Sequence, residues 1–148
     1  MCIRDRVIIG KGPDLPKLKQ IAQANPNIIF PGYLSDDQLL AYARGADVAV
    51  FPSRGESWGL VVAEAMACEL PVISSNVGKA SEFLGTDRGI LLDIETEEKL
   101  AEHIDYLLIN KNIAKGMGKR ARQCIVENYS WNEVAKKTKK IYTTLVKK

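Results

Sequence analysis

The sequence predicts an α/β protein, built as a doubly wound, Rossmann-like parallel sheet with helices on both faces. Short apolar runs alternate with segments of helical periodicity along the whole chain, at the spacing of right-handed βαβ units. The run DVAVF at 47–51 is continuously apolar after its first residue, which is typical of a parallel strand covered on both faces. No internal repeat interrupts the alternation.

The predicted strands are the short apolar runs, at 7–9, 27–31, 47–51, 71–74 and 89–92. Ligands of such sheets bind at the carboxyl ends of the strands. The segments that follow the strands carry the glycines and unpaired polar residues, at 10–13, 31–35, 52–58 and 74–81. We therefore expect the functional site on these four segments.

The predicted helices are the segments with apolar residues at three- and four-residue spacing, at 13–24, 35–44, 59–68, 95–109, 113–128 and 131–146. Ser35 is followed three residues later by Gln38, the pattern of a capping box at a helix start. Gly45 marks the end of the same helix.

Composition excludes several classes of protein. The 148 residues suit one domain with a single core, and 46% hydrophobic with 26% charged residues is ordinary for a globular chain. Cys2, Cys68 and Cys124 are too few and too scattered for a disulfide framework or a zinc site. A net charge of +3 without a basic stripe among aromatics does not indicate nucleic-acid binding. With no membrane-spanning run or signal peptide in the sequence, a cytoplasmic location is expected.

Residues 1–6, MCIRDR, form a charged leader that runs directly into the first predicted strand. A natural domain usually begins with a cap or turn before its first strand. We therefore interpret residues 1–6 as a non-native leader and residues 7–148 as the domain, incomplete at its N-terminal side.

The segment at 52–71 follows a buried strand and opens a helix. Gly55 and Gly59 remove side chains where a backbone would have to approach a ligand closely. Free amide donors are expected at the helix start, on Ser57, Trp58, Gly59 and Leu60. Such donors at the positive end of a helix favour a phosphate group.

Glu56 and Glu64 flank this helix start, with seven residues between them. Eight residues of continuous helix span about 12 Å, whereas the carboxyl pair of a glycosidase lies roughly 5 Å or 6.5–9.5 Å apart. The spacing therefore fits two contacts along one extended ligand. Glu64 would hold ribose hydroxyls, the helix start a diphosphate, and Glu56 a sugar.

The stretch at 55–75, GESWGLVVAEAMACELPVISS, resembles the hallmark segment of the retaining GT-B glycosyltransferases of family 4, the "glycosyl transferases group 1" type. IIGKGP at 8–13, the stretch at 27–53 and YSWNEVAKKTKKIY at 129–142 resemble further family segments in the same order. The resemblance covers about residues 7–142. It implies the C-terminal, donor-binding half of a GT-B fold, with the acceptor domain missing.

The resemblance implies transfer of a sugar from a nucleotide-diphosphate sugar to an acceptor, with retention of anomeric configuration. Glu56 matches the glutamate that contacts the transferred sugar, and Glu64 matches the one that holds the ribose. The amides of 57–60 would hold the phosphates, Leu34 would meet the base, and Gly12 belongs to the glycine-rich turn. The acceptor would be a glycan, a lipid-linked molecule or a small molecule. No metal or other cofactor is implied, and the sequence contains no Asp-x-Asp.

The sequence departs from the family pattern in two places. Glu69 and Lys79 stand where the family usually has glycine. We interpret Glu69 as a change at a helix end, and we expect Lys79, in a ligand-side loop, to alter donor binding unless it is only a surface lysine. The family's diphosphate-neutralising Arg and Lys precede the segment at which this chain begins, so the chain alone is expected to be inactive.

Two other functions stay open: a non-catalytic nucleotide-binding fragment, and a GT-B-like epimerase acting on a sugar nucleotide. Trp58 is interpreted as a packing residue rather than a stacking platform. The last predicted helix carries a row of lysines, Lys136, Lys137, Lys139, Lys140, Lys147 and Lys148. We interpret them as a solvated face over a packed apolar stripe, and the alternative is peripheral contact with an anionic membrane.

Overall fold

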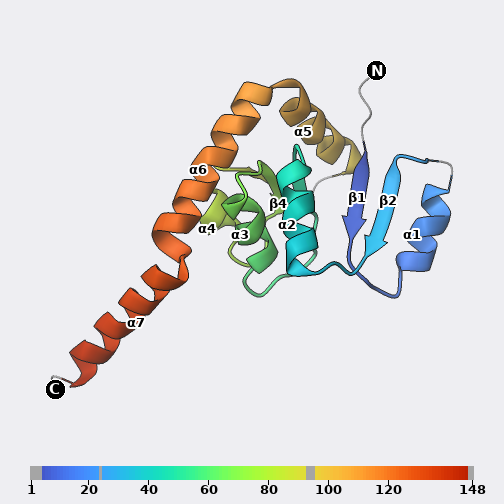
Figure 1. Ribbon diagram of the computed structural model, residues 1–148. Helices are drawn as coiled ribbons and strands as arrows, with labels where there is room; N and C mark the ends of the chain where they lie inside the picture. Colours follow the sequence, from blue (N-terminus) through green and yellow to red (C-terminus); the bar gives the residue numbers. More distant parts are fainter. Residues whose placement is uncertain (1–4, 24, 93–95, 147–148) are drawn as a thin grey trace. The chain divides into compact units, whose positions relative to one another are not determined.

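The computed structural model describes residues 5–23, 25–92 and 96–146 (Figure 1). It divides the chain into two compact units, Met1–Tyr42 (unit 1) and Ala43–Lys148 (unit 2). Four parts of the predictions lie outside the described residues: residues 1–4 of the expected leader, residue 24, residue 95, and the lysines at 147 and 148.

Unit 1 contains β1 (Arg6–Ile9), α1 (Leu15–Ala22), β2 (Ile28–Gly32) and most of α2 (Asp36–Gly45). The two strands pair in parallel, as predicted, with Arg6 opposite Ile28. α1 begins later than expected, because residues 13 and 14 form a turn that is closed by a hydrogen bond from the Leu15 amide to the Gly12 carbonyl, 3.2 Å long.

The start of α2 confirms the predicted capping box. The Ser35 amide donates to Gln38 Oε1 over 3.0 Å, and the Gln38 amide donates to Ser35 Oγ over 3.4 Å. Two amides that have no partner inside the helix are thereby satisfied by local side chains.

Unit 2 is the larger unit, and its elements follow in chain order as β3 (Ala49–Phe51), α3 (Leu60–Ala67), β4 (Val72–Ser75), α4 (Ala80–Leu84), β5 (Ile90–Leu92), α5 (Glu97–Ile109), α6 (Lys111–Tyr129) and α7 (Trp131–Val146). The three strands form a parallel sheet in the order β3-β4-β5. The strands of the chain are thus divided between two sheets, where the alternating pattern predicted one. Alternation predicts parallel pairing, but it does not indicate where one sheet ends.

β4 lies at the centre of unit 2, and helices cover both faces of its sheet, as predicted. Val72 and Ile73 are both fully buried, and neighbours along a strand point to opposite faces. Val72 packs in a cluster with Met66 of α3 and Phe83 of α4, whereas Ile73 packs in a second cluster with Leu107 of α5. α6 contributes side chains to both clusters.

Glu69 follows the end of α3 with a φ of 63°, in the left-handed region that favours glycine. Its place at a helix end is the one predicted. α6 crosses this point so closely that a Cβ atom on Gly118 would lie 1.9 Å from the Glu69 carbonyl oxygen. Arg122 of α6 also donates to the Ala67 carbonyl, and its Nε lies 3.7 Å from the Glu69 carboxylate. The end of α3 is therefore held against α6 by backbone approach and by polar contacts.

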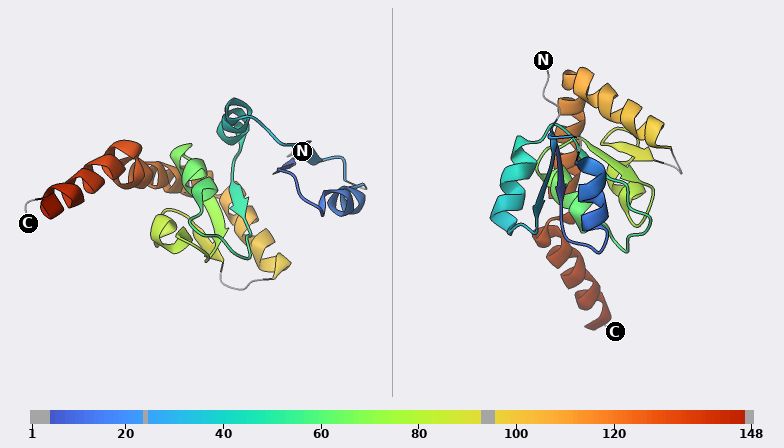
Figure 2. Two further views of the ribbon diagram at one scale, coloured as in Figure 1. Left: turned by 90° about the horizontal axis from the view of Figure 1, so that it is seen from below. Right: turned by 90° about the vertical axis from the view of Figure 1, so that its right-hand side faces the viewer.

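α7 continues the chain beyond α6 (Figure 2) and buries none of its side chains among the described residues. The predicted packing of its apolar stripe is therefore wrong for this structure, because no described part of unit 2 covers the stripe. Its apolar residues are exposed, including Trp131, Val134, Ile141, Tyr142, Leu145 and Val146. Within the described residues, no helix has both the length and the apolar content that crossing a bilayer requires.

Candidate functional site

The segment between β3 and α3 carries the central predicted residues, and Gly59 determines its geometry. Gly59 is the buried N-cap of α3. Its φ of 87° lies in the left-handed region, where residues other than glycine are strained. The helix proper starts at Leu60, one residue later than predicted. We call residues 56–60 the α3 turn.

The α3 turn exposes free backbone donors. Within the described residues, no backbone or side-chain acceptor is paired with the amides of Ser57, Trp58, Gly59 or Leu60. The first bonds of the helix come later, from Val62 and Ala63 to the Gly59 carbonyl, at 3.0 and 3.3 Å. A hollow of about 170 Å³ is lined by residues 56–61. An anion in this hollow would meet amide donors at the positive end of α3.

Glu56 is held at the edge of this hollow. Ser53 Oγ donates to Glu56 Oε1 over 3.3 Å. The segment after β4 approaches the backbone of Glu56 so closely that a Cβ atom on Gly78 would lie 3.1 Å from the Glu56 carbonyl oxygen. Gly78 also has a positive φ of 58°. The segments that follow β3 and β4 therefore approach each other at Glu56 and Gly78. The absence of a side chain at Gly78 allows this approach, and the sequence analysis did not assign Gly78 this role.

Glu64 lies on the outer side of α3. Its neighbours Ala63 and Ala65 are buried, whereas Glu64 is exposed. Among the described residues its carboxylate has no hydrogen-bond partner, so it is open to a ligand.

Trp58 packs rather than projecting freely, as its interpretation predicted. Its ring meets Phe83 edge-on at a centroid distance of 4.8 Å and Tyr129 at 6.1 Å. Its carbonyl accepts a hydrogen bond of 3.3 Å from the Lys79 amide. The α3 turn is thus attached to α4, to the loop before α4 and to the end of α6.

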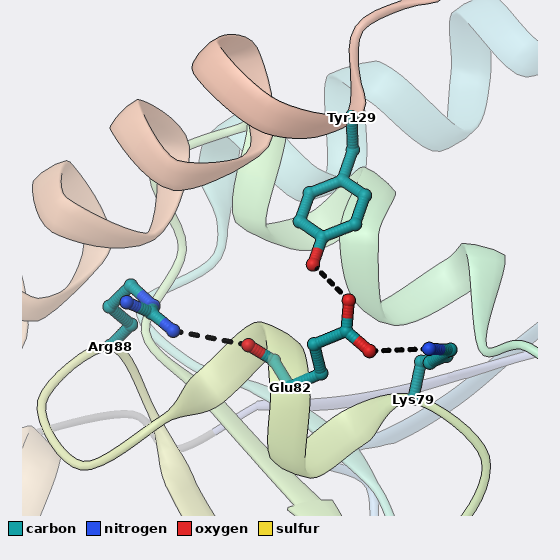
Figure 3. A network of polar contacts seen from close by, with 4 residues as sticks. All are labelled: Lys79, Glu82, Arg88 and Tyr129. Atoms are coloured by element: carbon teal, nitrogen blue, oxygen red, sulfur yellow. Dashed lines mark hydrogen bonds and ion pairs between the residues drawn. The ribbon is translucent and has the colours of Figure 1, made fainter. Parts of the chain in front are cut away.

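Glu82 of α4 is hydrogen-bonded to two of these neighbours, Lys79 and Tyr129 (Figure 3). Its Oε2 accepts from Lys79 Nζ over 2.5 Å, and its Oε1 accepts from the Tyr129 hydroxyl over 2.5 Å. Arg88 fixes the backbone here by donating to the carbonyls of Glu82 and Phe83. Hydrogen bonds from Lys79 and Tyr129 lower the pKa of Glu82. Burial and the bond to Glu82 raise the pKa of Tyr129 to about 12.

Sequence reasoning missed Glu82 and Tyr129, which are 47 residues apart in the chain. Lys79 was noticed only as a departure, and the structure shows it in an ion pair with Glu82. The spacing of Lys79 and Glu82, three residues apart at a helix start, is a local signal that could have indicated their pairing.

Gly12 and Leu34 belong to unit 1, on the turns that follow β1 and β2. The first of these turns is joined to the end of β2 by a hydrogen bond of 2.9 Å from the Gly10 amide to the Gly32 carbonyl. Lys11 Nζ also lies 5.4 Å from the centre of the Tyr33 ring. Unit 1 thus brings the two turns together, and unit 2 brings together Glu56 and the amides of the α3 turn.

Comparison with known proteins decides the family. Residues 5–124 match the family described as Glycosyl transferases group 1. The chain belongs to this family. Within the described residues of this family member, no group of three or more His, Cys, Asp or Glu side chains is placed to hold a metal ion.

The chain is also similar to individual named proteins. The GDP-mannose-dependent alpha-(1-6)-phosphatidylinositol monomannoside mannosyltransferase of Mycobacterium tuberculosis is 31% identical over 142 residues, which are 88% of this chain and 37% of that protein. The structure of sucrose-phosphate synthase from Thermosynechococcus elongatus matches with a TM-score of 0.83 and 28% identity, over 95% of this chain and 38% of that one.

A third similar structure, Anabaena HepE in complex with UDP-glucose, has a TM-score of 0.79 at 21% identity, over 97% of this chain and 41% of that one. At that identity it supports the fold alone. Together the structures confirm the predicted fold class, one half of a GT-B fold. The chain spans less than half the length of each of these three proteins.

Proposed function

We propose that this chain is the donor-binding half of a retaining glycosyltransferase and binds a nucleotide-diphosphate sugar. The observation that carries the proposal is the α3 turn, where free amides at a helix N-terminus lie beside the held carboxylate of Glu56. Helix N-termini with free amides are anion sites, and a carboxylate next to them suits the hydroxyls of a neutral sugar better than a second anion.

In this proposal each predicted residue has one task. The amides of 57–60 hold the diphosphate, Glu56 contacts the transferred sugar, and Glu64 accepts hydrogen bonds from the ribose hydroxyls. In unit 1, the backbone of Leu34 meets the base, and Gly12 keeps its turn free of a side chain. The site takes the sugar nucleotide as co-substrate, without a metal or a separate cofactor.

The proposed reaction replaces one bond at the anomeric carbon. The bond to the diphosphate oxygen breaks, and a bond to the acceptor hydroxyl oxygen forms on the same face of the sugar. The acceptor proton passes to the departing diphosphate oxygen, which becomes more basic as the bond breaks. The amides of the α3 turn would stabilise the charge that develops on the leaving group.

The relatives support a nucleotide-sugar donor without deciding which nucleotide it carries. One relative is named for GDP-mannose and one structure holds UDP-glucose. We propose that the acceptor is bound by a separate acceptor domain, in the part of the relatives' length that this chain does not span.

The proposal is tested by calorimetric titration of the purified chain with UDP, GDP and ADP. We expect preference for one nucleotide, and binding about 10- to 100-fold weaker in Glu64→Ala, because charge-assisted hydrogen bonds to the ribose are lost. Glu102→Ala, the same change at another exposed glutamate, on α5, is the matched control and should leave affinity unchanged. A folded chain that binds none of the three nucleotides would contradict the proposal.

We also propose a cytoplasmic location with peripheral contact at an anionic membrane. The support is α7, whose apolar residues are exposed beside Lys139 and Lys140, a composition suited to an interfacial helix. Flotation with liposomes tests this contact: binding should require anionic lipid, and equal flotation with purely zwitterionic liposomes would exclude it.

A further inference from the structure

Besides the contacts at Glu56, the α3 turn is braced from outside through Trp58. Its carbonyl is bonded to the Lys79 amide, and its ring packs against Tyr129 and Phe83. Phe83 and Tyr129 also meet each other edge-on at 5.0 Å. The orientation of the backbone amides next to Trp58 therefore depends on the positions of Lys79, Phe83 and Tyr129.

The neighbours are themselves connected by one carboxylate. Glu82 accepts from Lys79 Nζ with one oxygen and from the Tyr129 hydroxyl with the other, both over 2.5 Å (Figure 3). Lys79 comes from the loop after β4, and Tyr129 is the last residue of α6. Glu82 therefore joins two segments that both contact Trp58, and its own backbone is held by Arg88.

We propose that Glu82 is a positioning residue for the α3 turn, which it orients by holding Lys79 and Tyr129 against Trp58. The proposal rests on the donor-binding function proposed above, and it adds a residue that acts on the site through others. Glu82 itself does not have to touch the donor.

The proposal is testable because a positioning role and a purely electrostatic role of Glu82 predict opposite changes in nucleotide affinity when its charge is removed. A carboxylate near an anion site disfavours a diphosphate, so removing its charge should strengthen nucleotide binding if Glu82 acted only through charge. Positioning predicts the reverse: binding weakens when the bonds to Lys79 and Tyr129 are lost, even though the site becomes more positive.

The experiment is calorimetric titration of the whole chain with whichever of UDP, GDP and ADP the unmodified chain binds. We expect binding about 3- to 10-fold weaker in Glu82→Gln and in Tyr129→Phe, the effect of losing one well-placed hydrogen bond. Tyr106→Phe removes a hydroxyl from an exposed tyrosine on α5 and should bind like the unmodified chain.

Lys79 provides the conservative rescue. Lys79→Arg retains a cation that can pair with Glu82 and should keep most of the affinity, whereas Lys79→Met should lose as much as Tyr129→Phe. A loss in Lys79→Met with no loss in Glu82→Gln and Tyr129→Phe would mean that Lys79 acts on the nucleotide by its own charge, and this result overturns the proposal.

A second measurement does not depend on any nucleotide. In a Trp131→Phe background Trp58 is the remaining tryptophan, so the long-wavelength edge of the near-UV circular dichroism, to which tyrosine does not contribute, reports the packing of Trp58. Glu82→Gln should reduce this signal while far-UV circular dichroism stays unchanged. An unchanged Trp58 signal together with unchanged affinity overturns the positioning role but leaves the donor site intact, whereas failure of the unmodified chain to bind contradicts the donor site itself.

Discussion

Units 1 and 2 follow the same strand–helix pattern but are packed very differently. Among the described residues, every buried hydrophobic side chain belongs to unit 2, and none of unit 1 is buried. β1 is exposed along its whole length, whereas the central residues of β4 are fully buried. Unit 1 is held mainly by its strand ladder and local turns, and unit 2 by two apolar clusters.

This difference indicates how the candidate site is supported. The α3 turn, whose amides would all have to point at one anion in the proposed donor site, stands on the packed unit. Gly12 and Leu34 stand on the unit whose folded state depends little on apolar burial. Groups that must be precisely oriented need rigid support, and the α3 turn has this support.

The largest effect should come from the same substitution made in a strand of each unit. Ile73→Ala in β4 removes a fully buried side chain and should lower the free energy of unfolding by about 2–5 kcal/mol. Ile29→Ala in β2, where the side chain is 44% exposed, should cost less than about 1 kcal/mol. Urea unfolding followed by far-UV circular dichroism checks this, because both units contain helices that contribute to the signal. Equal losses would mean that the units share one core.

Two glycines of α6 sharpen the account of packing inside unit 2. Gly118→Ala should destabilise by about 2–3 kcal/mol, because the new Cβ atom would lie 1.9 Å from a backbone oxygen that cannot move aside freely. Gly116→Ala should instead stabilise by up to about 1 kcal/mol, because alanine favours helix. Its Cβ atom would meet only Nη1 of Arg120, at 3.3 Å, and the bonds from Arg120 to Asp87 use its other nitrogens, Nε and Nη2. Thermal unfolding of both variants should therefore show shifts of opposite sign.

Glu69 should show a smaller effect, and in the stabilising direction. Glu69→Gly removes a side chain from a residue with a φ of 63° and should raise stability by about 1 kcal/mol. The exposed pair with Arg122 that is lost contributes little. Glu69→Ala loses the same pair but keeps the strained backbone, so in chemical unfolding it should show no gain. A gain in both variants would point to the carboxylate rather than to the backbone.

The smallest effect should be the pH dependence of the Glu82 network. Hydrogen bonds from Lys79 and Tyr129 lower the pKa of Glu82, so its contribution to stability is present above its ordinary value of 4.5 and is lost as the pH falls through the lowered value. The pKa of Tyr129 is raised to about 12, so its contribution is present below its ordinary value of 10.0 and is lost as the pH rises through about 12.

The charged and titratable groups around this network are Lys79, Lys137, Arg88 and Cys124. The difference in urea midpoint between the unmodified chain and Glu82→Gln should be constant from about pH 5 to 9 and should shrink in both acid and strong alkali. A difference that grows in acid would contradict the assigned direction of the Glu82 shift.

Local features of the fold could be predicted from the sequence. Ser35 and Gln38 are three residues apart, and their capping box is present as expected. The bounds predicted for α7 are those found, because its apolar residues recur with clear helical spacing. The place of the α3 turn, between a buried strand and a helix, was also predictable, since Gly59 and the strand are both local signals.

Features that depend on distant residues could not be predicted. The helix at Ala80–Leu84 is too short to show periodicity. The bond between Tyr129 and Glu82 and the approach of Gly118 to Glu69 join segments that have no shared pattern in the sequence. The exposure of the α7 stripe likewise depends on what packs against it, and an amphipathic pattern is the same whether or not its apolar face is covered.

The long separation between Glu82 and Tyr129 has a consequence for the order in which the protein is made. A ribosome releases α3 and its turn early, and it releases α4 soon afterwards. The hydroxyl that holds Glu82, 47 residues further along, and the ring that packs on Trp58 are then still to be synthesised. A nascent chain that stops before Tyr129 already contains Glu56, Glu64 and every amide of the turn. It lacks the Tyr129 contacts of the proposed brace. On the proposal above, the anion site would reach its final form only when the last turn of α6 has left the ribosome.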